Sequence, residues 1–158
     1  MRQVILLAAV LCVLTPAASE AATCTISGTG VAFGTYIPST ASPTNSTGTV
    51  TVTCSAFLET VNYSIALNAG ANSGGSFSNR RMLGGTAFLT YQLYTNAART
   101  TIWGDGTGGT VTVSDSYSCL LGCSNQSRNY TVFGRVPALQ WPRPGFYSDT
   151  IVATVTFN

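Results

Sequence analysis

Hydrophobic and polar residues alternate through much of this chain, and the last segment shows the pattern most clearly. One set of alternate positions holds Tyr147, Asp149, Ile151, Ala153, Val155 and Phe157, with mostly Ser and Thr between them. A period-two pattern rich in β-branched and aromatic residues predicts a half-buried β-strand. The chain has no lysine, the residue that often protects an exposed strand edge. We therefore expect the edge of this strand to pair with an earlier strand or with another chain.

Shorter alternating segments separated by Gly, Pro and Asn recur upstream, and none has a convincing helical period. We expect strands at 24–27 with 31–36 as a broken first strand, and at 50–54, 61–67, 89–93, 110–113 and 130–136. This spacing is typical of a two-sheet sandwich. An immunoglobulin-like sandwich needs one more strand beside its last long strand. The sequence thus predicts an all-β, immunoglobulin-like β-sandwich that is incomplete and is completed by a donor strand in trans. A first strand that switches sheets is the alternative way to close the gap.

The N-terminal segment has the three-part layout of a secretory signal peptide. Arg2 precedes an apolar run from Val4 to Leu14, which is too short to span a membrane, and small residues follow. Ser19 and Ala21 favour cleavage after Ala21, and cleavage after Ala17 is the next choice. We expect a signal peptide at 1–21 and one exported domain at 22–158.

Composition argues against several classes of function. Removing the signal peptide leaves six of seven basic and four of five acidic residues, so the net charge stays near +2. With so few charges, a nucleic-acid surface is not expected. The chain has no histidine, and the remaining acids lie in turns or at strand edges, so we expect no enzyme and no cofactor. These acids are Glu59, Asp105, Asp115 and Asp149.

Four cysteines remain after cleavage, and an even count in an exported chain predicts disulfides. Four thiols allow three connectivities. Cys119 and Cys123 are four positions apart, so a local bridge is favoured, which leaves Cys24 to join Cys54. A metal site at Cys119 and Cys123 is the alternative, but the chain offers no histidine to complete it.

Three further features have an ordinary structural interpretation beside a functional one. The glycine-rich segment 104–109 lacks the lysine of a phosphate loop and the carboxylates of a calcium loop, so we read it as a turn. Arg80 and Arg81 follow a Gly/Ser loop and are expected to be a solvated turn. Trp103 and Trp141 could bind a surface glycan, or they could pack against the core and beneath a loop.

Several colinear motifs resemble the spore coat protein U domain family, whose members include secreted pilin subunits of archaic chaperone-usher pili. The motifs extend through almost all of the exported chain: CTIS at 24–27, VAFGTY at 31–36, STGTVTVTC at 46–54, YQLYT at 91–95, IWGDGT at 102–107, YTVFGR at 130–135 and PGFYSDT at 144–150.

The resemblance implies a particular route of assembly. A periplasmic chaperone lends a strand to the incomplete fold, and a neighbouring pilin subunit replaces it at an outer-membrane usher. The chain would thus be a structural or adhesive subunit of a pilus or coat on a Gram-negative bacterium, reaching the surface through the periplasm. The last strand would form one wall of the acceptor groove and the chaperone-binding surface, with Tyr147, Ile151, Ala153, Val155 and Phe157 facing the donor.

The chain departs from a polymerising pilin in one respect. Such a subunit carries an alternating apolar donor segment ahead of its first cysteine, whereas Cys24 closely follows the expected cleavage site. We therefore expect a tip or chain-starting subunit, which accepts a strand but does not donate one. A free-standing secreted lectin-like adhesin or a spore coat protein is the alternative. The segment Cys119–Cys123 looks like an insertion relative to the family pattern.

Overall fold

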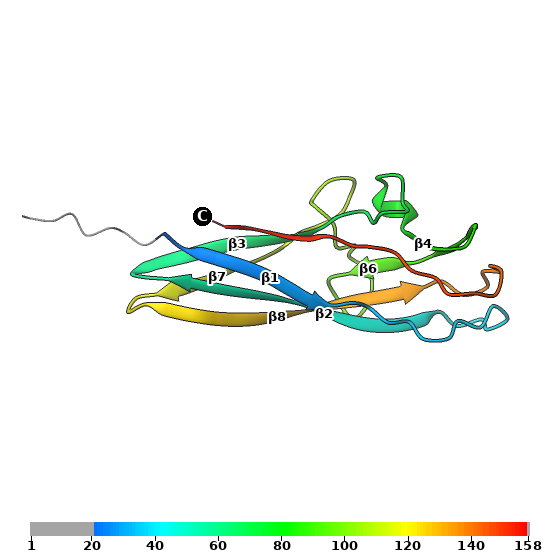
Figure 1. The fold of residues 1–158 in the computed structure, drawn as a ribbon, viewed down its shortest axis with the longest axis horizontal. Helices are drawn as coiled ribbons and strands as arrows, with labels where there is room; N and C mark the ends of the chain where they lie inside the picture. Colours follow the sequence, from blue (N-terminus) through cyan, green and yellow to red (C-terminus); the bar gives the residue numbers. More distant parts are fainter. Residues whose placement is uncertain (1–20, 158) are drawn as a thin grey trace, which may run out of the picture.

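The computed structural model describes residues 21–157 and contains strands and one short 3-10 helix (Figure 1). The expected signal peptide, apart from Ala21, lies outside the described residues. No helix between residues 21 and 157 has both the length and the apolar character needed to cross a membrane. The elements in chain order are β1 (Thr23–Thr29), β2 (Thr44–Ala56), β3 (Glu59–Leu67), η1 (Phe77–Asn79), β4 (Arg81–Gly84), β5 (Ala87–Thr90), β6 (Gln92–Tyr94), β7 (Val113–Cys119), β8 (Cys123–Val136) and β9 (Ala153–Phe157).

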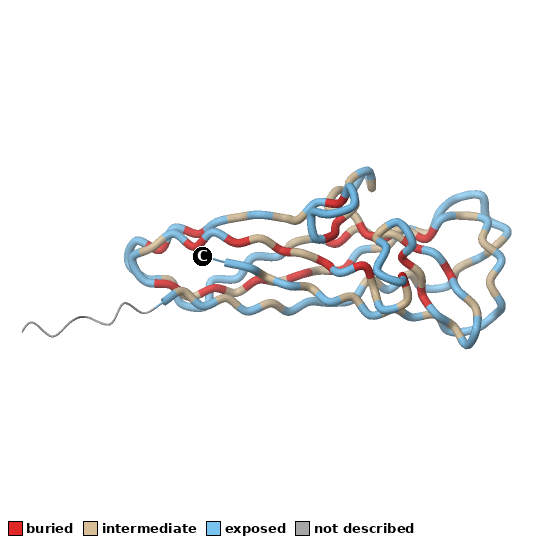
Figure 2. Tube along the Cα trace, turned by 90° about the horizontal axis from the view of Figure 1, so that it is seen from above, coloured by how far each residue is buried: buried red, intermediate tan, exposed pale blue. Residues whose placement is uncertain are grey.

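Two antiparallel sheets pack face to face, as the sequence pattern predicts. One sheet has the order β1-β2-β8-β6, the other has the order β7-β3-β9, and β4 and β5 form a separate hairpin. Buried residues are spread along the length of an elongated molecule (Figure 2). Val52 and Val132 from the first sheet join Val61 and Ile65 from the second in one hydrophobic cluster.

The predicted strand 89–93 is two strands, because the chain changes partners at Tyr91. Residues before Tyr91 belong to β5 and pair with β4, whereas residues after it belong to β6 and pair with β8. The Tyr91 backbone N–H donates to the Arg80 carbonyl (3.0 Å) at the changeover. Alternation of side chains continues through such a switch, so a periodic pattern alone does not reveal it.

The predicted strand at 110–113 is also misplaced, since β7 begins at Val113 and continues to Cys119. Residues 31–36 form no strand in the part of the chain described, although Val31 and Phe33 pack against the core. They cross directly over Gly134, where a Cβ atom would lie 2.6 Å from Val31 Cγ1 and 2.8 Å from Phe33 Cζ. Only glycine permits this crossing.

Both disulfides favoured by the cysteine spacing are present. Cys24 joins Cys54 across the β1–β2 ladder, where the two residues are directly opposite each other. Cys119 joins Cys123 across the turn between β7 and β8. The segment that looked like an insertion is therefore the turn that carries the chain from β7 in one sheet to β8 in the other.

Candidate functional site

Within residues 21–157, the outer edges of β1 and β9 have no partner strand, and these two edges lie on the same side of the sandwich. β1 pairs only with β2, and β9 pairs only with β3. The two strands lie near each other but form no ladder with one another (Figure 1). The described sandwich is therefore open between β1 and β9, in agreement with the predicted incomplete fold.

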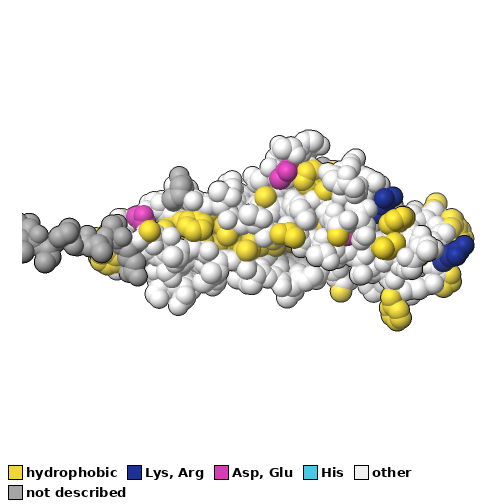
Figure 3. Space-filling view, turned by 45° about the horizontal axis from the view of Figure 1, so that its top comes forward, with side chains coloured by type: hydrophobic (Ala, Val, Ile, Leu, Met, Phe, Trp, Pro, Cys, Tyr) yellow, Lys and Arg dark blue, Asp and Glu magenta, His cyan; other side chains and the backbone are white. Residues whose placement is uncertain are grey.

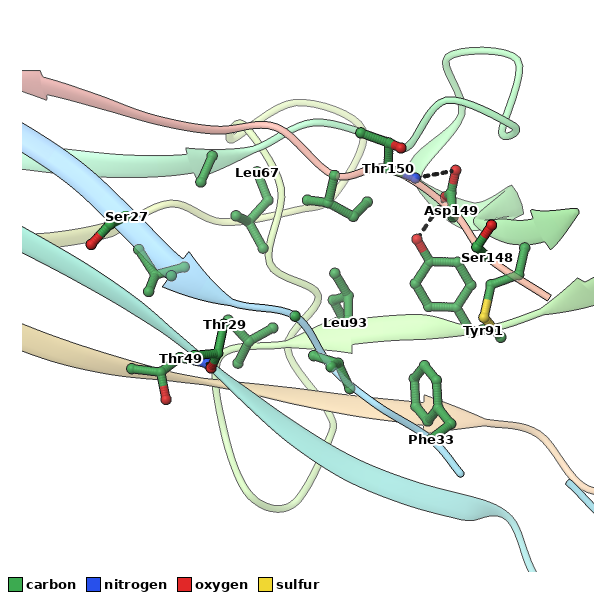
Figure 4. A pocket seen from close by; sticks show the side chains of 18 of the residues that line it. Ser27, Thr29, Phe33, Thr49, Leu67, Tyr91, Leu93, Ser148, Asp149 and Thr150 are labelled. Atoms are coloured by element: carbon green, nitrogen blue, oxygen red, sulfur yellow. Dashed lines mark hydrogen bonds between the residues drawn. The ribbon is translucent and has the colours of Figure 1, made fainter. Parts of the chain in front are cut away.

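A groove of about 620 Å³ occupies this opening. A row of hydrophobic side chains is visible along one face of the molecule (Figure 3). One wall is the second half of β1 with the residues that follow it, from Ile26 to Phe33, and the other wall is the segment 147–153. The close-up view shows side chains from both walls directed into the space between them (Figure 4). The floor is mostly apolar and comes from Val50, Leu67, Met82, Tyr91, Leu93 and Val132.

The second wall of the groove is the segment 147–153, and its backbone forms hydrogen bonds on one side. The Ser148 N–H and carbonyl bond to Leu83 (3.1 and 2.8 Å), the Thr150 carbonyl accepts from Ala71 N–H (3.1 Å), and the Val152 carbonyl accepts from Asn68 N–H (2.9 Å). Backbone groups alternate in direction along an extended strand. The N–H and carbonyl groups of odd-numbered residues, such as Ile151, therefore point toward the open side of the groove.

The sequence predicted a continuous strand from Tyr147 to Phe157, whereas β9 begins only at Ala153. The reason is that β3 ends at Leu67, so the segment before Ala153 meets an irregular loop and the β4 hairpin instead of a regular strand. The segment remains extended and keeps its alternation of side chains.

Three of the five predicted groove residues line the groove: Tyr147, Ile151 and Ala153. Val155 is half-buried and packs against the core beyond the groove. Phe157 is 38 % exposed and borders a separate shallow depression beside Tyr63. Whether any of the five contacts a chaperone stays a prediction.

One end of the groove is polar, and Asp149 is its centre. Asp149 Oδ2 accepts from the Tyr91 hydroxyl (2.7 Å) (Figure 4). Its Oδ1 accepts from the Asn72 side chain and backbone (2.9 and 3.2 Å) and from the Thr150 N–H (2.9 Å). Burial, together with this bond to Asp149, raises the pKa of Tyr91 well above its usual value. The hydroxyl therefore stays protonated and donates its hydrogen.

Arg80 is fully buried beneath this polar end, so the expectation of a solvated turn was wrong for it. Its guanidinium donates to the carbonyls of Asn68 (2.7 Å) and Trp103 (2.8 Å) and to Gln92 Oε1 (2.8 Å). Burial lowers the pKa of Arg80, while nearby Tyr91 and Asp149 act in the opposite direction. The alternation of side chains could have predicted this burial, because Arg80 is two positions before buried Met82 and falls on the same face of an extended chain.

The other candidate residues lie apart from the groove lining. Trp103 is fully buried and its indole N–H donates to the Ile65 carbonyl (3.0 Å), so it belongs to the core. Trp141 is 75 % exposed. Asp105 accepts from the Thr107 hydroxyl (2.6 Å) and N–H (2.8 Å), which is the geometry of the predicted turn.

Asp115 lies on β7, where its Oδ2 accepts from the Arg128 guanidinium (2.6 Å) and the Tyr130 hydroxyl (2.7 Å). The Tyr130 hydroxyl also bonds to the Tyr63 hydroxyl. These contacts, the bond from Arg128 first among them, lower the pKa of Asp115 to about 2.

Comparisons with known proteins give a family and a fold. Residues 9–154 match the family model described as the Spore Coat Protein U domain. No curated protein sequence matches the chain. A similar solved structure is a chain from the chaperone–tip adhesion subunit pre-assembly complex of the archaic chaperone-usher Csu pili of Acinetobacter baumannii. It has 22 % sequence identity and a TM-score of 0.54, and the match covers 85 % of this chain and 39 % of that chain. The chain thus spans well under half of that neighbour, and the likeness concerns the fold.

Proposed function

Because this chain belongs to the Spore Coat Protein U domain family, we propose that it is a subunit of a bacterial surface pilus or coat that functions by accepting a β-strand from a partner. One observation carries the proposal. The unpaired edges of β1 and β9 border an apolar groove that is open along the side of the sandwich.

An incoming strand would find both kinds of contact that strand addition needs. Backbone groups of odd-numbered residues on the second wall would supply the hydrogen bonds, and pockets over the floor would receive alternate side chains. Leu67 and Leu93 form an apolar part of that floor. Backbone pairing gives such a complex its affinity, while the fit of alternate side chains gives its specificity.

The partners that we propose follow the assembly route of chaperone-usher pili. A periplasmic chaperone would lend the first strand, and a neighbouring pilin subunit would replace it at an outer-membrane usher. The matched solved structure is described as a chaperone–tip adhesion subunit pre-assembly complex, and this likeness in fold supports a chaperone as a partner. The protein would then cross the periplasm of a Gram-negative bacterium and end at its surface.

The finer role that we propose is an adhesive tip or chain-starting subunit. It rests on the expected cleavage after Ala21, which would leave only Ala22 and Thr23 ahead of Cys24. A segment of this length is too short to act as a donor strand. The intact mass of the exported protein tests this point, because retention of a longer apolar N-terminus would favour a polymerising subunit.

The groove itself is tested by matched substitutions at neighbouring positions. Ile151 faces the groove, whereas Val152 is 54 % exposed on the opposite side. We expect Ile151→Asp to abolish co-purification of a strand-donating chaperone from the periplasm, because a charge would be buried beneath the donor. Val152→Asp should leave co-purification intact.

Equal capture of both variants would contradict strand acceptance. A partner-free monomer with both disulfides formed would instead favour a free-standing secreted adhesin or coat protein. Glycan screening would then be the next measurement, starting at exposed Trp141.

A further inference from the structure

The carboxylate at the polar end of the groove has an acceptor position to spare. Asp149 Oδ1 accepts three hydrogen bonds, two from Asn72 and one from the Thr150 N–H. Among residues 21–157, Oδ2 accepts one, from the Tyr91 hydroxyl. A carboxylate offers about four lone-pair positions, two on each oxygen. Asp149 Oδ2 can therefore accept one further hydrogen bond, and both Asp149 and Tyr91 line the groove (Figure 4).

The loop beside Asp149 is shaped to hold this carboxylate in place. A Cβ atom at Gly70 would collide with Asp149 Oδ2, and Gly70 has a φ of 94°, so both the space and the backbone conformation require glycine. Asn72, two residues further on, binds Oδ1 through its backbone and its side chain. The carboxylate is thus fixed and half-buried at the border of the groove.

The charge of Asp149 has a counterpart inside the protein. Arg80 is fully buried beneath this end of the groove. Burial lowers the pKa of its guanidinium, and Asp149 acts in the opposite direction, as a nearby carboxylate does. Because the two charges offset each other, a second cation brought to this end would be repelled by Arg80. A side chain that donates a hydrogen bond without carrying a charge suits the site better.

An incoming strand would place one side chain directly beside Asp149. A donor residue that pairs with Asp149 has its side chain on the same face of the sheet, with the two Cβ atoms about 4.5–5.5 Å apart. The next donor side chain on that face pairs with Ile151, which lines the groove together with Leu67 and Leu93. Two successive inward positions of the donor therefore meet different surroundings, one polar and one apolar.

We propose that the strand accepted by this protein carries a hydroxyl or amide side chain where it pairs with Asp149, and an apolar side chain where it pairs with Ile151. The inference rests on the proposed function and adds the chemistry of one donor position to it. An apolar residue beside Asp149 would exclude water from the unused acceptor position without replacing its hydrogen bond. An acidic residue would place two like charges opposite each other. Asp149 would thus select against donors whose inward positions are all apolar.

The test joins a donor strand of known sequence to the exported chain. An Asn-Gly turn added after Asn158 returns the new strand antiparallel along β9 and the segment 147–153, and the length of the turn fixes which residues pair. The inward positions of the added strand are Val, except that the position paired with Asp149 is Thr, Val, Lys or Glu in turn. A Gly/Ser tail of the same length controls for strand acceptance itself. Urea unfolding gives the folding equilibrium constant of each protein.

We expect the strand with Thr beside Asp149 to give a folding equilibrium constant about tenfold above that with Val, because a hydrogen bond to a charged group is gained. Lys should give a lower constant than Thr, and Glu the lowest. The matched control is the same exchange at the position paired with Ile151, where Val should be better than Thr. In an Asp149→Asn background, the disadvantage of Glu relative to Val should shrink about tenfold, because the like charge is gone.

The outcomes separate this inference from strand acceptance. Equal constants for Thr and Val, a higher constant for Lys, the same preference at both positions, or a Glu disadvantage that Asp149→Asn leaves unchanged would each overturn the role of Asp149. Strand acceptance would still stand in those cases. If none of the added strands stabilised the protein more than the Gly/Ser tail, strand acceptance would be overturned, and this inference with it.

Discussion

The Tyr91 hydroxyl donates a hydrogen bond to Asp149 Oδ2 at 2.7 Å, which ties the floor of the open groove to its second wall. Tyr91 is buried at the point where the chain passes from β5 to β6, and Asp149 lies in the extended segment before β9. The same carboxylate also fixes the loop at Asn72. One side chain thus holds together three segments that are far apart in the sequence.

We expect Asp149→Ala to destabilise the protein by about 2–3 kcal/mol, because hydrogen bonds to a charged group are lost and the buried Tyr91 hydroxyl is left without its acceptor. Urea unfolding followed by the fluorescence of buried Trp103 measures this. Asp105→Ala removes an acid in an exposed turn and should change the free energy of unfolding little. A similar loss of unfolding free energy in both variants would contradict the conclusion that Asp149 stabilises the fold through its hydrogen bonds.

Arg80→Lys should lower the free energy of unfolding by at least about 2 kcal/mol, although the charge is kept. A single ammonium group cannot reproduce the planar fork that reaches Asn68, Gln92 and Trp103. Arg143→Lys is the matched control at an exposed position, with an expected change within about 0.5 kcal/mol. The urea midpoints of unfolding of the parent chain and the two variants provide the comparison, with the same dependence of the unfolding free energy on urea concentration in each. An unaffected Arg80→Lys variant would show that burial of this side chain, and not its hydrogen bonds, is what matters.

Acidification should remove the stabilisation that comes from Asp115. Its folded pKa of about 2 is below the usual value near 3.9, so the unfolded chain binds a proton first as the pH falls. The contribution is therefore complete above about pH 4 and disappears as the pH approaches 2. Since the pair is accessible to solvent, we expect about 1 kcal/mol or less.

Asp115→Asn tests this contribution by comparison of unfolding free energies between pH 5 and pH 2. The stability gap between the parent chain and the variant should close as the pH falls through this range. A difference in unfolding free energy that stays constant would mean that the pKa of the Asp115 carboxyl is the same in the folded and unfolded chains.

Loss of the Cys24–Cys54 bridge should cost more than loss of the Cys119–Cys123 bridge. In the chain-entropy model, the longer loop contributes roughly 3–4 kcal/mol and the shorter loop roughly 2 kcal/mol. Paired Cys→Ala variants and thermal unfolding measure both. We also expect loss of the first bridge to impair strand capture, because it fastens β1, one wall of the groove, to β2. Unchanged capture would show that the β1–β2 ladder alone positions this wall.

The order of polar and apolar residues was sufficient for the fold class, the pairing of cysteines and most of one groove wall. Alternation at Ile151 and Ala153 gave their inward direction correctly, since side chains on an extended strand must point to opposite faces. Val155 and Phe157 follow the same alternation but lie beyond the groove. Periodicity states which face a residue occupies, but not where along the strand the opening is.

Only the tertiary structure decided which strands pair and which edges stay free. The partner change at Tyr91, the burial of Arg80 and the packing of Asp149 against Gly70 all join segments that are distant in sequence. Local patterns determine backbone conformation and side-chain direction through forces between near neighbours. The open edges of β1 and β9 result from the arrangement of all the strands in two sheets, and no short segment contains that information.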